Sequence, residues 1–390
     1  MKILLLTYEF PPVGGGGGRA AQDIAIGLAA RGHEIRVLTA HLDGLPLVET
    51  LNGIHVERIP TKRKTAFRAD FSEMADYDRV AVARGRKVIR EWQPDLIHAH
   101  FAVPTGAAAF MLSKLSGVPY VLTVHLGDVP GAVPEKTDRW FKWIFPLTPP
   151  IWRGAAKVVA VSEFTRQMAL RHYDVSVQVI PNGVELAALP AHQASDGTPR
   201  LVFAGRFMEQ KNPGHLVRAL SRLKDLPWAC AMLGDGPLLE SVRETVAGNG
   251  LTNRFSLPGW VTPEQVLSQF ARSDILVLPS RSEGLSVVGV QALGMGLAMV
   301  LSDVGGNLEL VRDGENGFIF PVGDLDALTN QLKKLIQNPS VLQSAQAKSR
   351  EMARKFDLAT IIDQYESLFE AVIENRKSKI ANRKIHVSIL

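Results

Sequence analysis

The sequence has one cysteine among its 390 residues and no apolar run that approaches the roughly 20 residues needed to span a bilayer. A lone cysteine excludes an internal disulfide bond and a zinc site made of several cysteines. Cys230 stands in an apolar run, so we expect it in the core rather than at a reactive site. The N-terminal apolar run is short, ends at Glu9 and lacks a small-residue cleavage site. We therefore expect a buried first strand rather than a signal peptide, and the cytoplasm as the compartment.

The chain also lacks a large excess of either charge, since its net charge is only +5. Hydrophobic residues make up 46% of the chain and charged residues 21%, which is typical of a soluble globular enzyme long enough for two domains. Basic residues concentrate between Lys62 and Arg90 and in the tail after Asn375. Such stretches are commonly solvated faces, and the alternative is contact with anionic lipid headgroups. The tail has no aromatic residue on which bases could stack, which disfavours a nucleic-acid partner.

Short apolar runs alternate with helical patterns twice along the chain. In the first half Ala20, Ile24 and Leu28 recur at helical spacing, and Gly32 ends that helix. A polar stretch with prolines at 187–199 is typical of a linker. The alternation predicts an α/β fold of two doubly wound, Rossmann-like parallel-sheet domains, whose ligands bind at the carboxyl ends of the strands. Strands are expected at 3–6, 35–39, 96–98, 120–124, 158–161, 201–204, 229–233, 255–257, 275–278 and 298–301.

The expected domains are residues 1–186 and 200–357, joined by the linker at 187–199. Residues 358–390 should supply helices that return to the first domain, followed by the basic tail. Two such domains that face each other would form a cleft.

Five consecutive glycines, residues 14–18, separate the first expected strand from the first expected helix. Glycine allows close backbone approach, and a helix start favours an anion. A dinucleotide-binding fingerprint would need an acidic residue about 20 positions later, where the sequence instead has Leu38-Thr39-Ala40. The pattern therefore favours a mobile glycine loop over a phosphate rather than an NAD site.

Two cations follow an expected strand in the second half. Arg206 and Lys211 precede Asn212 and Pro213, which suit the N-cap and first position of a helix. Two cations at a strand's carboxyl end suit a leaving diphosphate. Solvated surface bases are the alternative.

A third feature points to the same edge of the second sheet. Glu283 follows the expected strand 275–278, and the amides of residues 284–286 should project from the start of the next helix and bind an anion. Position 291 lies eight residues beyond Glu283, about 12 Å along a helix. One of the two side chains could reach the donor hexose and the other the ribose. The alternative for Glu283 is a simple helix-start acid.

The segment from Glu283 to Gln291 resembles the signature of glycosyltransferase family 4, in which seven residues separate two glutamates. Further motifs of that family occur in its order over residues 3 to about 370. The resemblance implies a retaining GT-B enzyme in which a terminal helix crosses back to the first domain. The motifs are Gly15-Gly16 with Arg19, Arg31-Gly32-His33, Pro94-Asp95 with His98 and His100, Thr123 with His125, Pro181-Asn182-Gly183-Val184, Gly205-Arg206 with Lys211, Gly234-Asp235-Gly236-Pro237, and Gly305-Gly306 with Glu309.

The resemblance also implies roles for individual residues. Arg206 and Lys211 would hold the diphosphate, and His125 would lie beside the sugar at the reacting centre. Gln291 replaces the family's second glutamate, and an amide offers the ribose one acceptor oxygen where a carboxylate offers two. The expected catalytic residues are His125, Arg206, Lys211 and Glu283, and the expected donor-binding residues are Gly15, Gly16, Arg206, Lys211, Glu283, Gly284, Leu285, Ser286 and Gln291.

The implied reaction moves a hexosyl group from a nucleotide-diphosphate sugar, UDP- or GDP-linked, to a glycan, lipid-linked or small-molecule acceptor in envelope or exopolysaccharide biosynthesis. The anomeric configuration would be kept, and the leaving phosphate oxygen would take the acceptor's proton. Two alternatives stay open: a sugar-nucleotide epimerase of the same fold, and a non-catalytic nucleotide-sugar-binding protein disabled by Gln291.

No metal or other cofactor is expected. His98 and His100 have a metal-like spacing but no third ligand at a convincing position. Asp324 and Asp326 resemble a metal-binding acidic pair, yet a helix follows, so N-capping explains them better. The cations and helix dipoles could stabilise the leaving group instead.

An aromatic cluster lies between Trp140 and Trp152. A core or interdomain helix would explain it. The alternative is an acceptor wall or a peripheral contact with an anionic membrane at the inner face.

Overall fold

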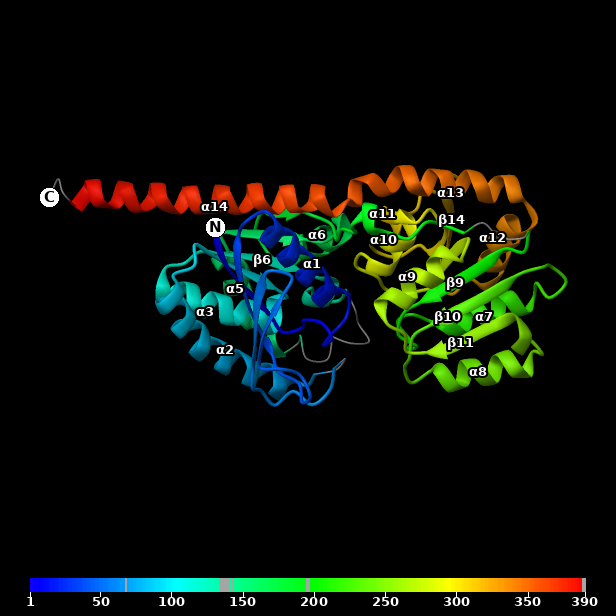
Figure 1. Cartoon of the computed structure of the whole chain (residues 1–390), viewed down its shortest axis with the longest axis horizontal. Helices are drawn as coiled ribbons and strands as arrows, with labels where there is room; N and C mark the ends of the chain where they lie inside the picture. The colour runs from blue at the N-terminus through cyan, green and yellow to red at the C-terminus, as the bar shows by residue number, and fades with distance from the viewer. Residues whose placement is uncertain (67–68, 133–140, 142, 194–196, 388–390) are drawn as a thin grey trace. The chain divides into compact units, whose positions relative to one another are not determined.

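The computed structural model describes residues 1–66, 69–132, 141, 143–193 and 197–387. The chain divides into two compact units: unit 1 is Met1–Pro181 with Leu358–Leu390, and unit 2 is Asn182–Asp357 (Figure 1). The boundary therefore precedes the expected linker at 187–199. The reason is that Val184 pairs with Asp357, and its amide donates to the carbonyl of Phe356 at 2.9 Å, which attaches this segment to unit 2.

Unit 1 contains an eight-stranded sheet in the order β3-β4-β2-β1-β5-β6-β7-β8. Every neighbouring pair is parallel except β3 and β4, which form an antiparallel hairpin. The five strands expected here are present, and β3, β4 and β8 are additional. The strands are β1 (Lys2–Thr7), β2 (Glu34–Ala40), β3 (Val48–Leu51), β4 (Ile54–Ile59), β5 (Leu96–His100), β6 (Tyr120–Val124), β7 (Lys157–Ala160) and β8 (Val177–Val179).

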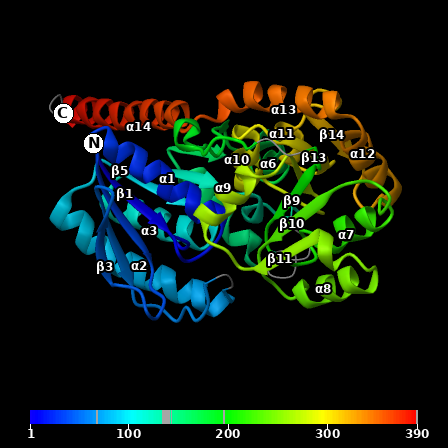
Figure 2. The ribbon, with the colours of Figure 1, turned by 45° about the vertical axis from the view of Figure 1, so that its right-hand side comes forward.

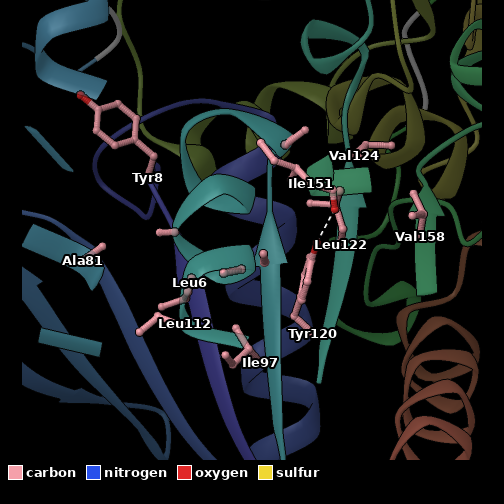
Figure 3. Close-up of a cluster of buried hydrophobic side chains, with 14 of the residues drawn as sticks. Leu6, Tyr8, Ala81, Ile97, Leu112, Tyr120, Leu122, Val124, Ile151 and Val158 are labelled. Carbon is pink, nitrogen blue, oxygen red and sulfur yellow. Dashed lines mark hydrogen bonds between the residues drawn. The ribbon is translucent and has the colours of Figure 1, made fainter. Parts of the chain in front are cut away.

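Helices cover both faces of this sheet. Because side chains alternate along a strand, Leu6 of β1 and Ile97 of β5 point into the core beneath α2, α3 and α5, whereas Ile3 and Leu5 point to the opposite core (Figure 3). In the first core the Tyr120 hydroxyl donates to the carbonyl of Ile151. The helices are α1 (Gly16–Ala30), α2 (Phe71–Trp92), α3 (Ala107–Ser116), α5 (Pro149–Gly154), α6 (Glu163–Leu170) and α14 (Leu358–Val387), with short turns η1 (Ala102–Gly106), η2 (Leu126–Asp128) and η3 (Phe145–Leu147).

The C-terminal helix α14 lies beside α1 on the second face (Figure 2). Gly27 of α1 allows the close approach, because a Cβ there would lie 2.7 Å from the Ile362 side chain. Arg31 forms an ion pair with Glu366 at 2.7 Å. The returning segment therefore belongs to unit 1 through both apolar and charged contacts.

Unit 2 contains a fully parallel six-stranded sheet in the order β11-β10-β9-β12-β13-β14. The five strands expected here are present, and β14 is additional. Cys230 of β10 is buried, as predicted, and burial raises its pKa. The strands are β9 (Arg200–Ala204), β10 (Ala229–Leu233), β11 (Phe255–Gly259), β12 (Ile275–Leu278), β13 (Ala298–Ser302) and β14 (Gly317–Phe320). The helices are α7 (Pro213–Ser221), α8 (Leu239–Gly248), α9 (Pro263–Ala271), α10 (Val287–Gly294), α11 (Asn307–Leu310), α12 (Leu325–Gln337) and α13 (Pro339–Ala353), with turns η4 (Leu186–Ala188), η5 (Thr252–Arg254) and η6 (Arg354–Phe356).

Candidate active site

Each sheet has one point at which the strand order reverses direction. In unit 1 it lies between β1 and β5, and in unit 2 between β9 and β12. Loops at the carboxyl ends of two such strands diverge and leave room for a ligand. The candidate catalytic and donor-binding residues follow the carboxyl ends of β1, β6, β9 and β12, except Gln291, which lies within α10.

Lys211 and Glu283 meet at the switch point of unit 2. Lys211 follows β9, Glu283 follows β12, and the Lys211 Nζ and Glu283 Oε2 atoms lie 2.5 Å apart. Both side chains are largely buried, with 15% and 8% exposed. A charge-assisted contact of this kind is strong where water is excluded. The structure thus brings together two residues that stand 72 positions apart in the sequence.

Main-chain contacts join the loops that carry these two residues. The amide of Arg281 donates to the carbonyl of Gln210 at 2.7 Å, and the Gln210 side chain donates to the carbonyl of Ser282 at 3.2 Å. Lys211 and Glu283 are therefore fixed by their neighbours as well as by their own contact.

The loop after β13 supports Glu283 from the other side. The amide of Gly306 donates to the carbonyl of Glu283 at 3.0 Å, and a Cβ at position 306 would lie 1.4 Å from the carbonyl oxygen of Gly284. Asn182, which is buried, donates to the carbonyl of Leu285 at 3.2 Å. Sequence reasoning assigned no role to Gly306 or Asn182, although both belong to motifs that it recognised.

The start of α10 presents amides at this edge. Ser286 is the N-cap, and its hydroxyl accepts from the amide of Gly289 at 3.2 Å. No described residue accepts a hydrogen bond from the amides of Gly284, Leu285 or Val287. The first amides of a helix have no partner within it and carry a partial positive charge. An anion could bind here without further side chains.

One expectation about this segment is wrong. Residues 283–286 are not helical, since α10 begins at Val287. The 12 Å helical spacing from Glu283 to Gln291 therefore does not apply. Gln291 itself is partly exposed on α10.

Arg206 lies on the same β9–α7 connection but does not join the buried pair. Its side chain is exposed, and no described residue forms an ion pair with it. Asn212 and Pro213 occupy the predicted N-cap and first helical position, although the Asn212 side chain makes no capping bond because its backbone is left-handed. Arg206 is thus available to an approaching anion.

The glycine run of unit 1 is only partly a loop. Gly15 is the N-cap of α1, and Gly16 is already its first residue, so the expected loop ends sooner than predicted. Two acceptors fix the run: Gly14 donates to the carbonyl of Ala66 at 2.8 Å, and Gly15 donates to the Glu9 carboxylate at 3.0 Å.

His125 directly follows β6 and lies against the start of α1. A Cβ at Gly17 would lie 2.6 Å from the Phe101 ring and 3.2 Å from the His125 ring, so glycine is needed for this approach. The rings of Phe101 and His125 are 4.6 Å apart. Burial of the imidazole lowers the pKa of His125 to about 4, so it is neutral at pH 7.

His98 and His100 are buried structural residues. His98 Nε2 lies 2.9 Å from the Thr123 hydroxyl, which lies 3.2 Å from the Tyr365 hydroxyl of α14. Burial lowers the pKa of His98 to about 3 and lowers that of His100 well below its usual value. Among the described residues, no three His, Cys, Asp or Glu side chains gather as metal ligands.

The remaining candidates are the Asp324 carboxylate and the aromatic cluster. Asp324 caps α12, because its carboxylate accepts from the amide of Ala327 at 2.8 Å, which confirms the capping interpretation. Trp140 lies outside the described residues. Trp143 is 83% exposed, whereas Trp152 is buried and stacks on Tyr173. In the described part of the chain, no helix is both long and apolar enough to cross a membrane.

Comparisons with known proteins show the family of this chain. The sequence pattern of Glycosyltransferase Family 4 matches residues 14–188, and that of Glycosyl transferases group 1 matches residues 198–338. A putative teichuronic acid biosynthesis glycosyltransferase, TuaC of Bacillus subtilis, is 32% identical over 266 residues, which cover 65% of this chain and 65% of that protein.

Solved structures share the whole architecture. Sucrose-phosphate synthase from Thermosynechococcus elongatus superposes with a TM-score of 0.84 at 19% identity, over 96% of this chain and 99% of that one. Anabaena Alr3699/HepE in complex with UDP-glucose gives a TM-score of 0.74 at 20% identity, over 95% and 100%. The expected GT-B fold is confirmed. With two Rossmann-like units and both family patterns along its length, this chain belongs to the family 4, group 1 glycosyltransferases.

Proposed function

We propose that this glycosyltransferase moves a hexosyl group from a nucleotide-diphosphate sugar to an acceptor with retention of anomeric configuration and without a metal. The main support for this proposal is the Lys211–Glu283 ion pair, which lies beside unpartnered amides at the switch point of unit 2. An ammonium and oriented amides suit a departing diphosphate, and a carboxylate suits the hydroxyls of a sugar.

In the proposed reaction, a bond forms between the acceptor oxygen and the anomeric carbon while the bond from that carbon to the diphosphate oxygen breaks. The acceptor's proton passes to the departing phosphate oxygen on the same face. Lys211, Arg206 and the amides of Gly284 to Ser286 stabilise the charge that develops on the diphosphate. Glu283 orients the sugar, Gln291 meets the ribose, and Gly15 and Gly16 at the start of α1 contact the donor.

His125 has a different role in this proposal. Because its pKa is about 4, the ring is neutral at the pH of the cell and can exchange hydrogen bonds with the sugar without adding charge. A cation next to the anomeric carbon would oppose the positive charge that develops there as the leaving group departs.

UDP- and GDP-sugars are the proposed donors, and a glycan, lipid-linked or small-molecule acceptor of envelope or exopolysaccharide biosynthesis completes the reaction. The complex of Anabaena Alr3699/HepE with UDP-glucose and the name of Bacillus subtilis TuaC support this choice. A thermal-shift screen across UDP-, GDP- and ADP-sugars tests it, since a bound donor raises the melting temperature as its concentration exceeds its Kd. No shift with any of these sugars would contradict the proposal.

Incubation of the stabilising donor with candidate acceptors, followed by NMR of the product, then fixes the stereochemistry. The anomeric coupling constant should match that of the donor. Altered donor without any acceptor would instead identify an epimerase, and donor binding without turnover would identify a binding protein.

We place the enzyme in the cytoplasm, with peripheral contact at the inner face of an anionic membrane. Trp143 and Leu147 are 83% and 71% exposed, Arg153 and Lys157 are exposed nearby in sequence, and no acidic residue occurs between 141 and 157. Aromatic residues favour the bilayer interface, and each nearby cation contributes about 1 kcal/mol on an anionic surface.

Sedimentation with vesicles that contain phosphatidylserine tests this contact against neutral vesicles. Trp143→Ala should weaken binding, whereas Trp260→Ala, which removes a 60% exposed tryptophan of unit 2, should not. Equal binding to neutral vesicles, or no binding to either, would remove the membrane from the proposal.

A further inference from the structure

A buried carboxylate joins two loops at the switch point of unit 1. Asp128 ends the turn η2 and is 3% exposed. One of its oxygens accepts from the amide of Ala102 at 2.8 Å and from that of Val103 at 3.4 Å. The other accepts from the amide of His125 at 2.8 Å. A single side chain therefore connects the loop after β5 with the loop after β6.

These two loops carry the aromatic contact that faces α1. Phe101 has a positive φ of 74°, a sparsely populated backbone conformation that costs on the order of 1–3 kcal/mol. Its amide donates to the carbonyl of Thr123 and its carbonyl accepts from Gly106, both at 2.9 Å. The amides that Asp128 holds are those of the next two residues. The carboxylate thus fixes the backbone on both sides of the Phe101–His125 ring contact.

The start of α1 leaves little tolerance for movement of these rings. A Cβ at Gly17 would overlap Phe101 and press on His125, so the two rings lie directly against the helix backbone. A small rotation of either loop would move the imidazole relative to the first amides of α1. An ångström of misplacement at a reacting centre can lower a rate by about 10²-fold.

We propose that Asp128 is a positioning residue, which holds the main chain of His125 and the 101–103 loop so that the imidazole stays in its working orientation. The inference rests on the proposed function, because it assigns His125 to the reacting centre. A carboxylate suits this task, since it offers acceptor sites on two oxygens and can serve amides that approach from two directions. Asparagine would keep one acceptor oxygen and turn an NH₂ group towards the other amide.

The test compares Asp128→Asn with Asp95→Asn. Asp95 stands at the opposite, amino-terminal end of β5, and its carboxylate also accepts from a main-chain amide, that of Lys2 at 2.8 Å. Both variants should lose a few degrees of melting temperature. Only Asp128→Asn should lower kcat, by about 10²-fold, while the KM for the nucleotide-sugar changes by less than about twofold, as expected when ground-state donor binding is untouched.

A double-mutant cycle separates positioning from a general loss of structure. In a His125→Ala background, Asp128→Asn should have little further effect on kcat, because the group it positions is gone. Independent, multiplicative losses in the two variants would overturn the proposal. So would an unchanged kcat in Asp128→Asn.

A third readout does not depend on turnover. The ring signals of His125 in an NMR spectrum of the full chain are identified by their absence in His125→Ala. They should move in Asp128→Asn and keep their positions in Asp95→Asn. If the chain transfers sugar but neither kcat nor these signals respond to Asp128→Asn, this inference fails alone. If no donor supports transfer while the signals move, the proposed function fails and the positioning of the ring stands.

Discussion

The two units place opposite chemistry at equivalent edges of their sheets. In unit 2 the switch point carries charge: the Lys211–Glu283 pair, exposed Arg206 and the amides before α10. In unit 1 the switch point carries glycines at the start of α1, an imidazole whose pKa burial lowers to about 4, and the Asp128 carboxylate, which main-chain amides hold. The difference supports the proposed anion site in unit 2, where among the described residues these cations and amides have no carboxylate partner other than Glu283, and close packing of backbone and rings in unit 1.

The largest effect is expected from removing a charge at the switch point of unit 2. Lys211→Ala should lower kcat by about 10²- to 10³-fold, the loss usual when one group that stabilises developing negative charge is removed. It also leaves Glu283 buried without its ion pair, so nucleotide affinity should fall too. Steady-state kinetics with the best donor measures both effects.

Lys333→Ala is the matched control, because it removes an exposed lysine of α12 in the same unit. It should leave kcat and KM unchanged. Equal activity of Lys211→Ala and the wild type would show that the buried pair has no role in catalysis.

Acid should destabilise unit 1 before unit 2. The pKa values of His98 and His125 are about 3 and about 4, below the ordinary value of 6.5. Between the ordinary and the lowered pKa values, the histidines of the unfolded chain bind protons that those of folded unit 1 do not. The free energy of unfolding therefore falls as the pH drops from 6.5 towards 4. The slope is on the order of 1.4 kcal/mol per pH unit for each histidine.

Hydrogen exchange at pH 7 and pH 5 measures this difference unit by unit. Amides of β5 and β6 should lose protection at pH 5 faster than those of β9 and β12. His98→Gln should reduce the pH dependence, since glutamine does not titrate. Uniform loss of protection in both sheets would contradict the assignment.

A smaller effect, tighter binding of the donor to unit 2, is expected from a substitution at Gln291. Gln291→Glu restores a second carboxylate on α10, and hydrogen bonds to charged groups exceed neutral ones by about 1 kcal/mol. Calorimetry should therefore show donor binding about fivefold tighter. Gln337→Glu, at the end of α12, is a control that adds the same charge elsewhere in the unit. Weaker binding in Gln291→Glu would show that Gln291 does not meet the ribose.

The smallest expected effect lies between α1 and α14. Glu366 pairs with Arg31 and lies 2.6 Å from His33, and the Arg31 hydrogen bond is the main cause that lowers the pKa of Glu366. Glu366→Gln should cost less than about 1 kcal/mol, because the groups are partly exposed. That stability is present above the ordinary carboxylate pKa and is lost in acid. Urea unfolding at pH 7 and pH 4 measures it, and an effect on kcat would be unexpected.

Much of the fold could be predicted because its signals are local. Strands such as β6, β10 and β12 were found at their observed bounds, since buried parallel strands are continuous apolar runs. The hairpin β3–β4 was missed because β3 is short and has no buried residue, although Asn52-Gly53, both with positive φ, is a typical hairpin turn. The helical spacing applied from Glu283 to Gln291 was wrong because residues 283–286 precede α10, and a polar turn with glycine has no periodicity to separate it from a helix start.

The candidate site could be predicted only as far as residue types and spacing allow. Lys211 and Glu283 were both identified, but their direct contact depends on β9 and β12 being neighbours, which strand runs alone do not specify. Gly306 acts through its main-chain amide and Asn182 through a side-chain hydrogen bond to a main-chain carbonyl, and no residue pattern predicts contacts with the main chain. Asp128 was missed for the same reason.

Binding of UDP and GDP to the full chain, measured by calorimetry in four variants, tests the central claim most directly. Arg206→Ala and Lys211→Ala should each weaken nucleoside diphosphate binding by about tenfold or more, the loss expected from a charge-assisted contact. His125→Ala and Lys333→Ala should leave it within about twofold, because their groups do not hold the anion. Loss of binding in His125→Ala with full binding in Lys211→Ala would place the diphosphate on unit 1 and contradict the account.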